Sequence, residues 1–390
     1  MASFFDTLSD RLDQAWKPHR RPSALRSYRC VCQRPVFFRN SECLACHSPL
    51  GYEPSRAQVL ALRAAPQAPG LWELAEDSAP QRFRRCANFE SPAGCNWLVP
   101  EHDPTPLCRA CRLNRTIPDL SQPDNAVLWH RIEAAKARLV SSLLALRLPV
   151  RSRIGEDPQH GLAFDFLRGL PGGPAVVTGH ADGIITLDIA EADDAHRERV
   201  RRQLHEPYRT LLGHLRHEVG HYYWERLVAG SAWLESFRTL FGDERRDYAA
   251  ALRRHYGEGP APDWARHHVS AYASAHPWED WAETWAHYLH MVDTLDTALS
   301  FGLEAEDLET GYEPFTPDCL YRPQDPDAAR FLSVVNAWTE LTGVLNELSR
   351  SMGQPDFYPF VLPRAAVAKL QFVHLVVTHA AEATVAASAG

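Results

Sequence analysis

The chain has 390 residues, of which 45% are apolar and 23% charged, and its formal net charge at pH 7 is −8. This length suffices for two or three domains with a buried core, and the composition is that of a soluble globular protein. No apolar run approaches membrane-spanning length, and the first ten residues lack the basic and then apolar order of a secretory signal, so we expect a cytoplasmic protein without a membrane partner.

Eight of the nine cysteines fall in the first third of the chain, in two sets of four. In a cytosolic protein such sets indicate metal rather than disulfides, and four thiolates can surround one structural zinc ion as a closed site. The C-x-x-C halves carry this prediction, whereas C-x-C and C-x8-C are looser than the usual knuckle. The expected ligands are Cys30, Cys32, Cys43 and Cys46 for one zinc, and Cys86, Cys95, Cys108 and Cys111 for the other.

Charge also divides the chain near residue 120. Residues 1–120 hold 16 Lys and Arg against 12 Asp and Glu, a balance of +4, and the rest of the chain has a balance of −12. Basic zinc ribbons can bind nucleic acid through phosphates, but +4 over this length is a weak footprint. We therefore expect the ribbons to support the fold or to dock a protein partner, and we do not expect a nucleic-acid partner.

Secondary structure changes after the cysteine region. Residues 117–124 read as a linker, and residues 125–146 have the apolar periodicity of an amphipathic helix. Residues 162–167, 175–178 and 184–189 are strand-like, and residues 179–183 read as a hairpin turn. A small β-sheet is therefore expected before the next helix.

The pattern H-E-x-x-H occupies residues 217–221, within apolar residues that recur at helical spacing up to about residue 228. Pro207 is expected to start or kink this helix. On a helix, His217 and His221 project from one face and can hold one Zn²⁺, and Glu218 lies at the edge of that face. There the carboxylate of Glu218 can act as the general base toward a water activated by the metal.

A catalytic zinc needs a third protein ligand, and residues 277–290 supply candidates. Pro277 suits the first turn of a helix. Glu279, Glu283 and His287 would line one face of it at successive i, i+4 steps, interleaved with tryptophans. From the residues alone, any one of the three can be the ligand, and the others are candidates for orienting a ligand imidazole.

H-E-x-x-H followed by Y-x6-E-D-x-A-E resembles the gluzincin metallopeptidases, and residues 272–283 are similar to the anthrax lethal factor catalytic domain. This resemblance implies that His217, His221 and Glu279 bind zinc, that Glu218 is the general base and that Tyr272 stabilises the oxyanion. It also implies that Glu283 does not bind the metal itself but contacts a residue that does. The whole chain is similar to a bacterial family of zinc-binding metallopeptidases with an N-terminal zinc-ribbon region.

The predicted fold class is α+β, with a zinc-ribbon region of two four-cysteine sites followed by a mostly helical, zincin-like (gluzincin) domain that contains a small β-sheet. The expected divisions are an N-terminal segment (1–25), the zinc-ribbon region (26–120) and the zincin-like domain (121–390). In that architecture an edge strand of the sheet pairs with an extended peptide, and residues 184–189 are the predicted strand. Residues 247–256, 325–351 and 365–381 are further predicted helices.

The predicted function is a zinc metallopeptidase that uses one catalytic and two structural zinc ions and acts on a peptide or protein substrate. Two alternatives stay open at this stage. One is a catalytically inert adaptor that binds zinc, and the other is a nucleic-acid-associated protein that uses its zinc ribbons.

Overall fold

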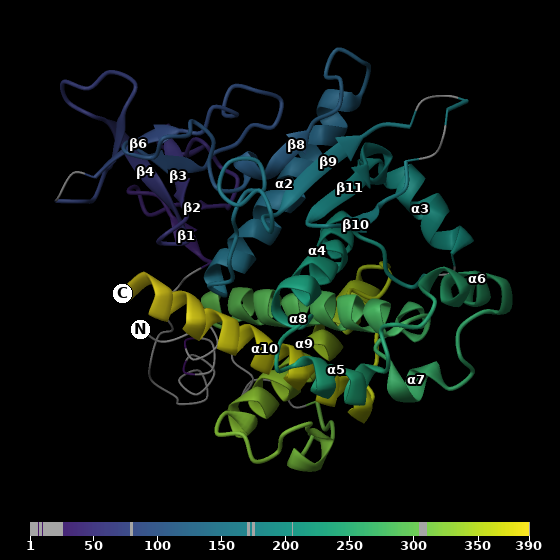
Figure 1. The fold of residues 1–390 in the computed structure, drawn as a ribbon. Helices are drawn as coiled ribbons and strands as arrows, with labels where there is room; N and C mark the ends of the chain where they lie inside the picture. The colour runs from purple at the N-terminus through teal and green to yellow at the C-terminus, as the bar shows by residue number, and fades with distance from the viewer. Residues whose placement is uncertain are drawn as a thin grey trace. The chain divides into compact units, whose positions relative to one another are not determined.

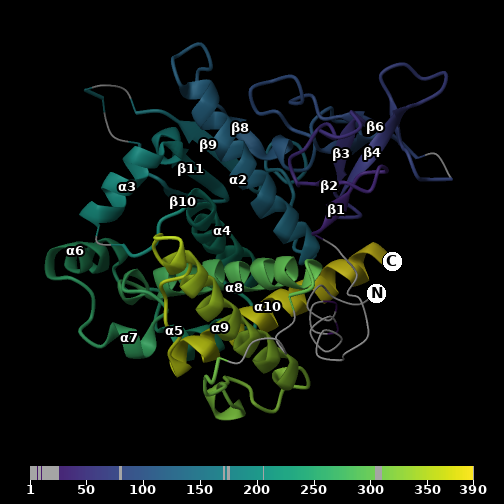
Figure 2. The ribbon, with the colours of Figure 1, turned by 180° about the vertical axis from the view of Figure 1, so that it is seen from behind.

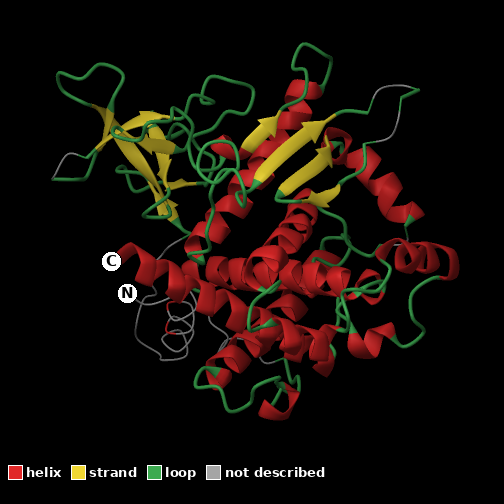
Figure 3. Cartoon of the chain, viewed as in Figure 1, coloured by secondary structure: helices red, strands yellow, loops and turns green. Residues whose placement is uncertain are grey.

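The computed structural model describes residues 26–78, 81–169, 172–173, 176–204, 206–303 and 310–389, together with Thr7 and Asp10. The fold is α+β, as predicted (Figure 1, Figure 3). Its contacts define two compact units. We call Ser23–Ala145 with Pro149–Val200 the N-terminal unit, and Leu146–Leu148 with Arg201–Gly390 the C-terminal unit. The predicted domain limit at residues 120 and 121 stays a prediction, because a unit defined by contacts need not be a domain.

The N-terminal unit begins with two antiparallel sheets. β1 (Tyr28–Arg29) and β2 (Pro35–Val36) pair as a short hairpin. A five-stranded meander follows, in the order β3-β4-β5-β6-β7. Its strands are β3 (Leu50–Glu53), β4 (Gln58–Ala64), β5 (Trp72–Leu74), β6 (Arg82–Arg85) and β7 (Leu98–Pro100). Leu62, Leu74, Phe83 and Leu98 form a buried cluster among these strands, so the cysteine region has a small core of its own.

A second sheet completes this unit, in the order β10-β11-β9-β8. Its strands are β8 (Asn114–Thr116), β9 (Ala163–Leu167), β10 (Gly179–Ala181) and β11 (Ile184–Asp188). α2 (Asn125–Ala145) is the predicted helix after the linker, and the ammonium group of its Lys136 lies over the rings of Phe164 and Phe166 of β9. The remaining elements are the 3-10 helices η1 (Cys111–Leu113) and η2 (Ile189–Ala192) and the helix α3 (Asp194–Gln203), within which the chain passes to the C-terminal unit.

The prediction that residues 184–189 form an edge strand is wrong. β11 pairs with β9 on one side and with β10 on the other, so both of its edges are occupied. A hairpin neighbour was expected, and the unexpected neighbour is β9, which pairs with β11 in parallel along its whole length. The hairpin is also tighter than predicted: Asp182 and Gly183 both have positive φ, which suits a two-residue turn. This turn folds residues 179–181, which we had assigned to the turn, back onto β11 as a strand. Of the predicted strand 175–178, residues 176–178 are not a strand and Ala175 lies outside the described residues.

The C-terminal unit is helical (Figure 2). Its elements are α4 (Leu211–Leu227), α5 (Leu234–Phe241), α6 (Tyr248–Glu258), α7 (Trp264–His267), η3 (Tyr272–Ser274), α8 (Pro277–Ser300), η5 (Pro317–Cys319), α9 (Ala328–Ser351) and α10 (Arg364–Ala389). α8 lies at the centre of the unit and packs against α4, α5, α9 and α10. The rings of Phe241, Trp281 and Phe372 meet between α5, α8 and α10, so the core of this unit is rich in aromatic residues.

Local sequence signals set the ends of the two helices that matter most for the site. Pro277 lies in the first turn of α8, as predicted, and the side chain of His276 caps that helix. α4 starts at Leu211 rather than near Pro207, because the hydroxyl of Thr210 accepts a hydrogen bond from the N–H of Gly213 and so caps the helix.

α4 and α8 cross at a glycine of the H-E-x-x-H segment (Figure 1, Figure 2). A Cβ at Gly220 would lie 3.1 Å from Cα of Ala282 and 3.2 Å from Cβ of Trp285. The indole N–H of Trp281 donates a hydrogen bond of 2.8 Å to the carbonyl oxygen of Gly220. The missing side chain at Gly220 therefore allows the two backbones to approach closely.

Replacing Gly220 by valine should destabilise the protein. The new side chain would meet the backbone of α8 and a buried indole, neither of which can move aside without disturbing the core, and overpacking of this kind costs about 1–3 kcal/mol. We expect a lower urea midpoint of the zinc-free protein, followed by circular dichroism. Gly257→Val is the matched control, since Gly257 lies in α6 and a Cβ there meets nothing within 4 Å. Equal midpoints for the two variants would contradict the proposed close approach.

Candidate metal centre

His217 and His221 lie in the buried middle of α4, one turn apart. Their Nε2 atoms are 3.2 Å from each other. Of the three downstream candidates, Glu279 in the first turn of α8 faces both Nε2 atoms. Its Oε2 is 3.0 Å from Nε2 of His217 and 3.6 Å from Nε2 of His221. Glu279 is 1% exposed, so its carboxylate is aimed at the histidines and not at solvent.

These three atoms fit a zinc ion. Zn–N and Zn–O bonds of about 2.0–2.1 Å arranged tetrahedrally place ligand atoms about 3.3 Å apart, and the observed separations bracket that value. Oε2 of Glu279 is buried and accepts no hydrogen bond from the described residues, which suits an oxygen that binds a metal. Among the described residues, His217, His221 and Glu279 form one of three groups of side chains that could hold a metal ion.

Glu283 holds the other side of one ligand imidazole. Its Oε1 lies 2.8 Å from Nδ1 of His217, and its Oε2 accepts a hydrogen bond of 2.5 Å from the hydroxyl of Ser270. A carboxylate at Nδ1 fixes the tautomer and the orientation of a histidine that binds metal through Nε2. Burial opposes protonation of His217, but Glu279 and Glu283 outweigh it and raise the pKa of this histidine well above its usual range.

His287 does not take the orienting role that we considered for it. Its Nδ1 is 2.5 Å from the hydroxyl of Tyr358, and its ring packs edge-on against Phe360. Burial lowers the pKa of His287 to about 4, although the negative charge of Glu283 acts in the opposite direction. His287 is therefore a neutral core histidine behind Glu283, and its described hydrogen bond leads away from both ligand imidazoles.

Glu218 follows the first histidine and stays outside the three-residue cluster. Its carboxylate is buried, and its Oε1 lies 3.4 Å from Nε2 of His214, one turn earlier on α4. Burial alone would raise the pKa of Glu218, but the contact with His214 and the charges of His217 and His221 hold it below its usual range. Glu218 is thus an ionised carboxylate beside the cluster, which is the state that a general base requires.

Tyr272 lies in η3, directly before α8, and its ring is tilted over that of His217 with centroids 5.9 Å apart. Burial raises its pKa well above the usual range, as do the negative charges of Glu279 and Glu218, so its hydroxyl stays protonated. His255 and Tyr256, at the end of α6, contact the same ring. The ring of Tyr272 therefore lies beside one candidate metal ligand, and its hydroxyl is protonated.

Sequence reasoning missed two residues of this site. The hydroxyl of Tyr248, the first residue of α6, donates a hydrogen bond of 2.5 Å to Oε1 of Glu279. Ser270 supports Glu283 from the segment before η3. Neither belongs to a recognisable motif. The one local signal is Asp247, which caps α6 through the N–H of Ala250 and so marks where the helix begins.

The eight cysteines of the N-terminal unit form the two predicted groups. Sγ atoms lie 3.5 Å apart for Cys30 and Cys46, 3.7 Å for Cys32 and Cys43, and 3.6 Å for Cys95 and Cys108. A disulfide needs about 2.05 Å, whereas thiolates at about 2.3 Å from a tetrahedral zinc lie about 3.8 Å apart. The spacing within both groups therefore fits zinc and excludes disulfides. Cys319 is a buried free thiol, as predicted.

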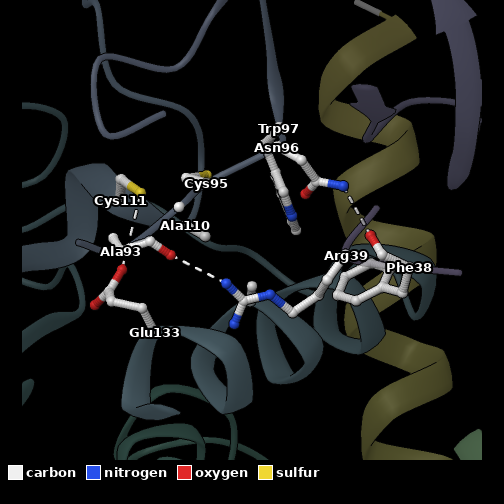
Figure 4. A pocket seen from close by; sticks show the side chains of 11 residues that line it. Phe38, Arg39, Ala93, Cys95, Asn96, Trp97, Ala110, Cys111 and Glu133 are labelled. Carbon is white, nitrogen blue, oxygen red and sulfur yellow. Dashed lines mark hydrogen bonds between the residues drawn. The ribbon is translucent and has the colours of Figure 1, made fainter. Parts of the chain in front are cut away.

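The buried carboxylate of Glu133 contacts the second cysteine group (Figure 4). It also accepts a hydrogen bond from the first residue of β8. A carboxylate oxygen of Glu133 on α2 lies 3.8 Å from Sγ of Cys111, and the other accepts hydrogen bonds from Lys136 and Asn114. Arg39 reaches the same region and donates to the carbonyl oxygen of Ala93. Arg39, Ala93 and Glu133 border a small pocket beside Cys95 and Cys111, which Phe38 and Trp97 also line.

Several arginines around the cysteines are engaged within the N-terminal unit. Arg112 pairs with Asp103 and Glu156, Arg115 pairs with Asp165, and Arg85 lies over the rings of Trp72 and Phe89. Side chains committed to internal partners are less available to phosphates. Carboxylates of the same unit therefore neutralise part of the positive charge of residues 1–120.

Comparison with known proteins agrees with this arrangement. Residues 125–376 match a family described as "Putative zinc-binding metallo-peptidase", and this match covers more than half of the chain. The chain belongs to this metallopeptidase family. Residues 27–122 match a zinc-ribbon domain, which confirms the predicted zinc-ribbon region before the metallopeptidase region.

The relatives extend over nearly the whole chain. Uncharacterized proteins of Mycobacterium bovis and Mycobacterium tuberculosis are each 42% identical to it over 359 residues, which covers 92% of this chain and 96% of theirs. No solved structure matches the chain. The zinc-binding family and the two cysteine groups together support zinc as the metal. Among the described residues, none of the helices combines the length and apolar character needed to cross a membrane.

Replacing Glu283 by alanine should weaken zinc binding at the His217 cluster without removing a ligand. His217 would lose the acceptor at its Nδ1, and loss of such a partner costs about 10–100-fold in metal affinity. We expect this decrease in competition with a chelator of known affinity. Glu382→Ala, which removes an exposed carboxylate of α10, is the control. Equal affinities in the two variants would rule out an orienting role for Glu283.

Proposed function

We propose that the protein is a gluzincin-type zinc peptidase, with His217, His221 and Glu279 as the ligands of the catalytic zinc and Glu218 as the general base. One observation carries this proposal: two histidines of one helix and one glutamate of another converge within bonding distance of a common point, while the neighbouring carboxylate of Glu218 remains outside the cluster. Three protein ligands leave a fourth position open, as in catalytic zinc sites. Two further zinc ions, one in each cysteine group, are structural.

When bound, zinc supplies a Lewis acid that polarises a peptide carbonyl and makes water a better nucleophile near neutral pH. The residues of the chain perform the remaining steps. Glu218 accepts a proton from the attacking water and donates it to the leaving amine. Glu283 holds His217 in place. Tyr272 donates a hydrogen bond to the carbonyl oxygen of the substrate as negative charge develops there.

The burial of Glu218 supports this role. A carboxylate shielded from bulk water keeps its interactions with nearby groups strong, and its contact with His214 holds it in one orientation. Because this carboxylate is ionised, it can accept a proton without first losing one. The alternative of an inert zinc-binding adaptor leaves the position of Glu218 without an explanation.

Glu218→Gln should abolish peptide hydrolysis while zinc stays bound. The amide cannot accept the proton, so we expect kcat to fall by about 10²–10⁴-fold. The measurement is cleavage of a peptide library by the full chain, with zinc content determined in parallel. His217→Ala should lose one zinc ion relative to Glu218→Gln, and Glu225→Gln, further along α4, is the activity control. Unchanged hydrolysis by Glu218→Gln would refute the assignment.

Tyr272→Phe should slow hydrolysis with little change in KM. The ring remains in place and only the hydroxyl that stabilises the transition state is lost, so kcat should decrease by about 10²–10³-fold. Steady-state kinetics on a cleaved library peptide provide the measurement, and zinc content should equal that of the wild type. A larger effect on KM than on kcat would mean that Tyr272 binds substrate instead.

A further inference from the structure

The two carboxylate oxygens of Glu279 have different surroundings. Oε2 faces Nε2 of His217 and of His221, and Oε1 accepts a hydrogen bond of 2.5 Å from the hydroxyl of Tyr248. Within the described ranges, Tyr248 is the one hydrogen-bond donor to Oε1. The tyrosine comes from α6, 31 residues earlier in the chain, so a second element of the fold reaches this candidate ligand.

Two rings at the start of α8 contact the ring of Tyr248, which is 38% exposed. It packs edge-on against His276 and Trp278, with centroids 5.2 Å and 5.9 Å away. His276 caps α8, and its Nε2 lies 3.1 Å from the carbonyl oxygen of Arg246, two residues before Tyr248. The start of α6 is therefore attached to the start of α8, which places the hydroxyl of Tyr248 beside Glu279 without a metal ion.

A carboxylate that binds metal has a choice that an imidazole lacks. It can use one oxygen or both, and it can rotate about its last side-chain bond. A strong hydrogen bond to one oxygen removes that choice, because using both oxygens would require the bond to be lost or lengthened. Without the bond, Oε1 would also be a buried acceptor with no partner, which disfavours the observed position of Glu279.

We propose that Tyr248 is a positioning residue that restricts Glu279 to binding through Oε2 alone. The consequence for catalysis rests on the proposed function: if Glu279 fills one coordination position of the zinc ion, the fourth position stays open to substrate. The effect on metal binding itself does not depend on peptide hydrolysis.

Tyr248→Phe tests the proposal on the full chain, with zinc and with Co²⁺ as a spectroscopic probe. We expect zinc affinity at the His217 cluster to fall by about 10–100-fold, the range for loss of a partner that supports a metal ligand. We also expect the visible absorption bands of bound Co²⁺ to shift, because the coordination by Glu279 changes. Tyr256→Phe is the matched control, because it removes a hydroxyl from the same helix. The ring of Tyr256 contacts Tyr272, and no described hydrogen bond joins its hydroxyl to Glu279, so zinc affinity and the Co²⁺ spectrum should stay at the wild-type values.

A second experiment asks whether Tyr248 acts through Glu279. In a Glu279→Asp background the shorter carboxylate no longer reaches the hydroxyl, so adding Tyr248→Phe should cause no further loss of affinity. Tyr248→His, which keeps a ring and an N–H donor, should bind zinc more tightly than Tyr248→Phe. Melting curves of the zinc-free variants check folding, and if Tyr248→Phe does not fold, Tyr248→Leu, which also lacks a donor, takes its place in both experiments.

The outcomes separate this inference from the proposed function. Wild-type affinity and an unchanged Co²⁺ spectrum in Tyr248→Phe would overturn it, as would an equal loss in the Glu279→Asp background or a zinc affinity for Tyr248→His no higher than that of Tyr248→Phe. Weakened zinc binding in a protein that cleaves no peptide would support the positioning role and contradict the peptidase.

Discussion

The site depends on the close approach of α4 and α8 at Gly220. Because no side chain stands between the helices there, the backbone of α8 passes next to the H-E-x-x-H segment, and the indole of Trp281 reaches the carbonyl oxygen of Gly220. Glu279 and Glu283 lie one turn apart on the same helix. At this separation, one carboxylate reaches Nε2 of His217 and the other reaches Nδ1 of the same ring. A single contact between helices thus places a candidate ligand and the group that orients another ligand.

Without a bound cation, burying these carboxylates together costs free energy. Glu218, Glu279 and Glu283 bring three carboxylates into a region largely withdrawn from water, where the ion pairs of the described residues join them to histidines. The fold compensates elsewhere. Arg216 pairs with Asp293, and Lys369 pairs with Asp280, so each of these buried charges on α8 has its own partner. A divalent cation bound at the His217 cluster would stabilise the three carboxylates there in the same way.

Short-range features of the site followed from the sequence, and long-range ones did not. The spacing of His217 and His221, the first turn of α8 at Pro277 and the i, i+4 relation of Glu279 to Glu283 are all properties of a single helix. Choosing among Glu279, Glu283 and His287 from the residues alone was not achievable, because the choice depends on how α8 is rotated against α4. Tyr248 was missed because its contact with Glu279 depends on how α6 lies against the start of α8. The place of β11 in its sheet was misjudged because its parallel pairing with β9 joins strands that are distant in the sequence, which periodicity does not reveal.

The second cysteine group extends this reasoning to the N-terminal unit. Cys111 begins η1, which leads without a gap into β8, and β8 pairs with β9. Glu133 on α2 touches the sulfur of Cys111 and, through Asn114, the first residue of β8. A zinc ion held by Cys86, Cys95, Cys108 and Cys111 would therefore fix the start of β8 as well as the ribbon, since four thiolates around one ion restrict every segment that carries them. Metal binding in this group would thus contribute to the stability of the sheet formed by β8, β9, β10 and β11. The second cysteine group and this sheet would then unfold together rather than as separate modules.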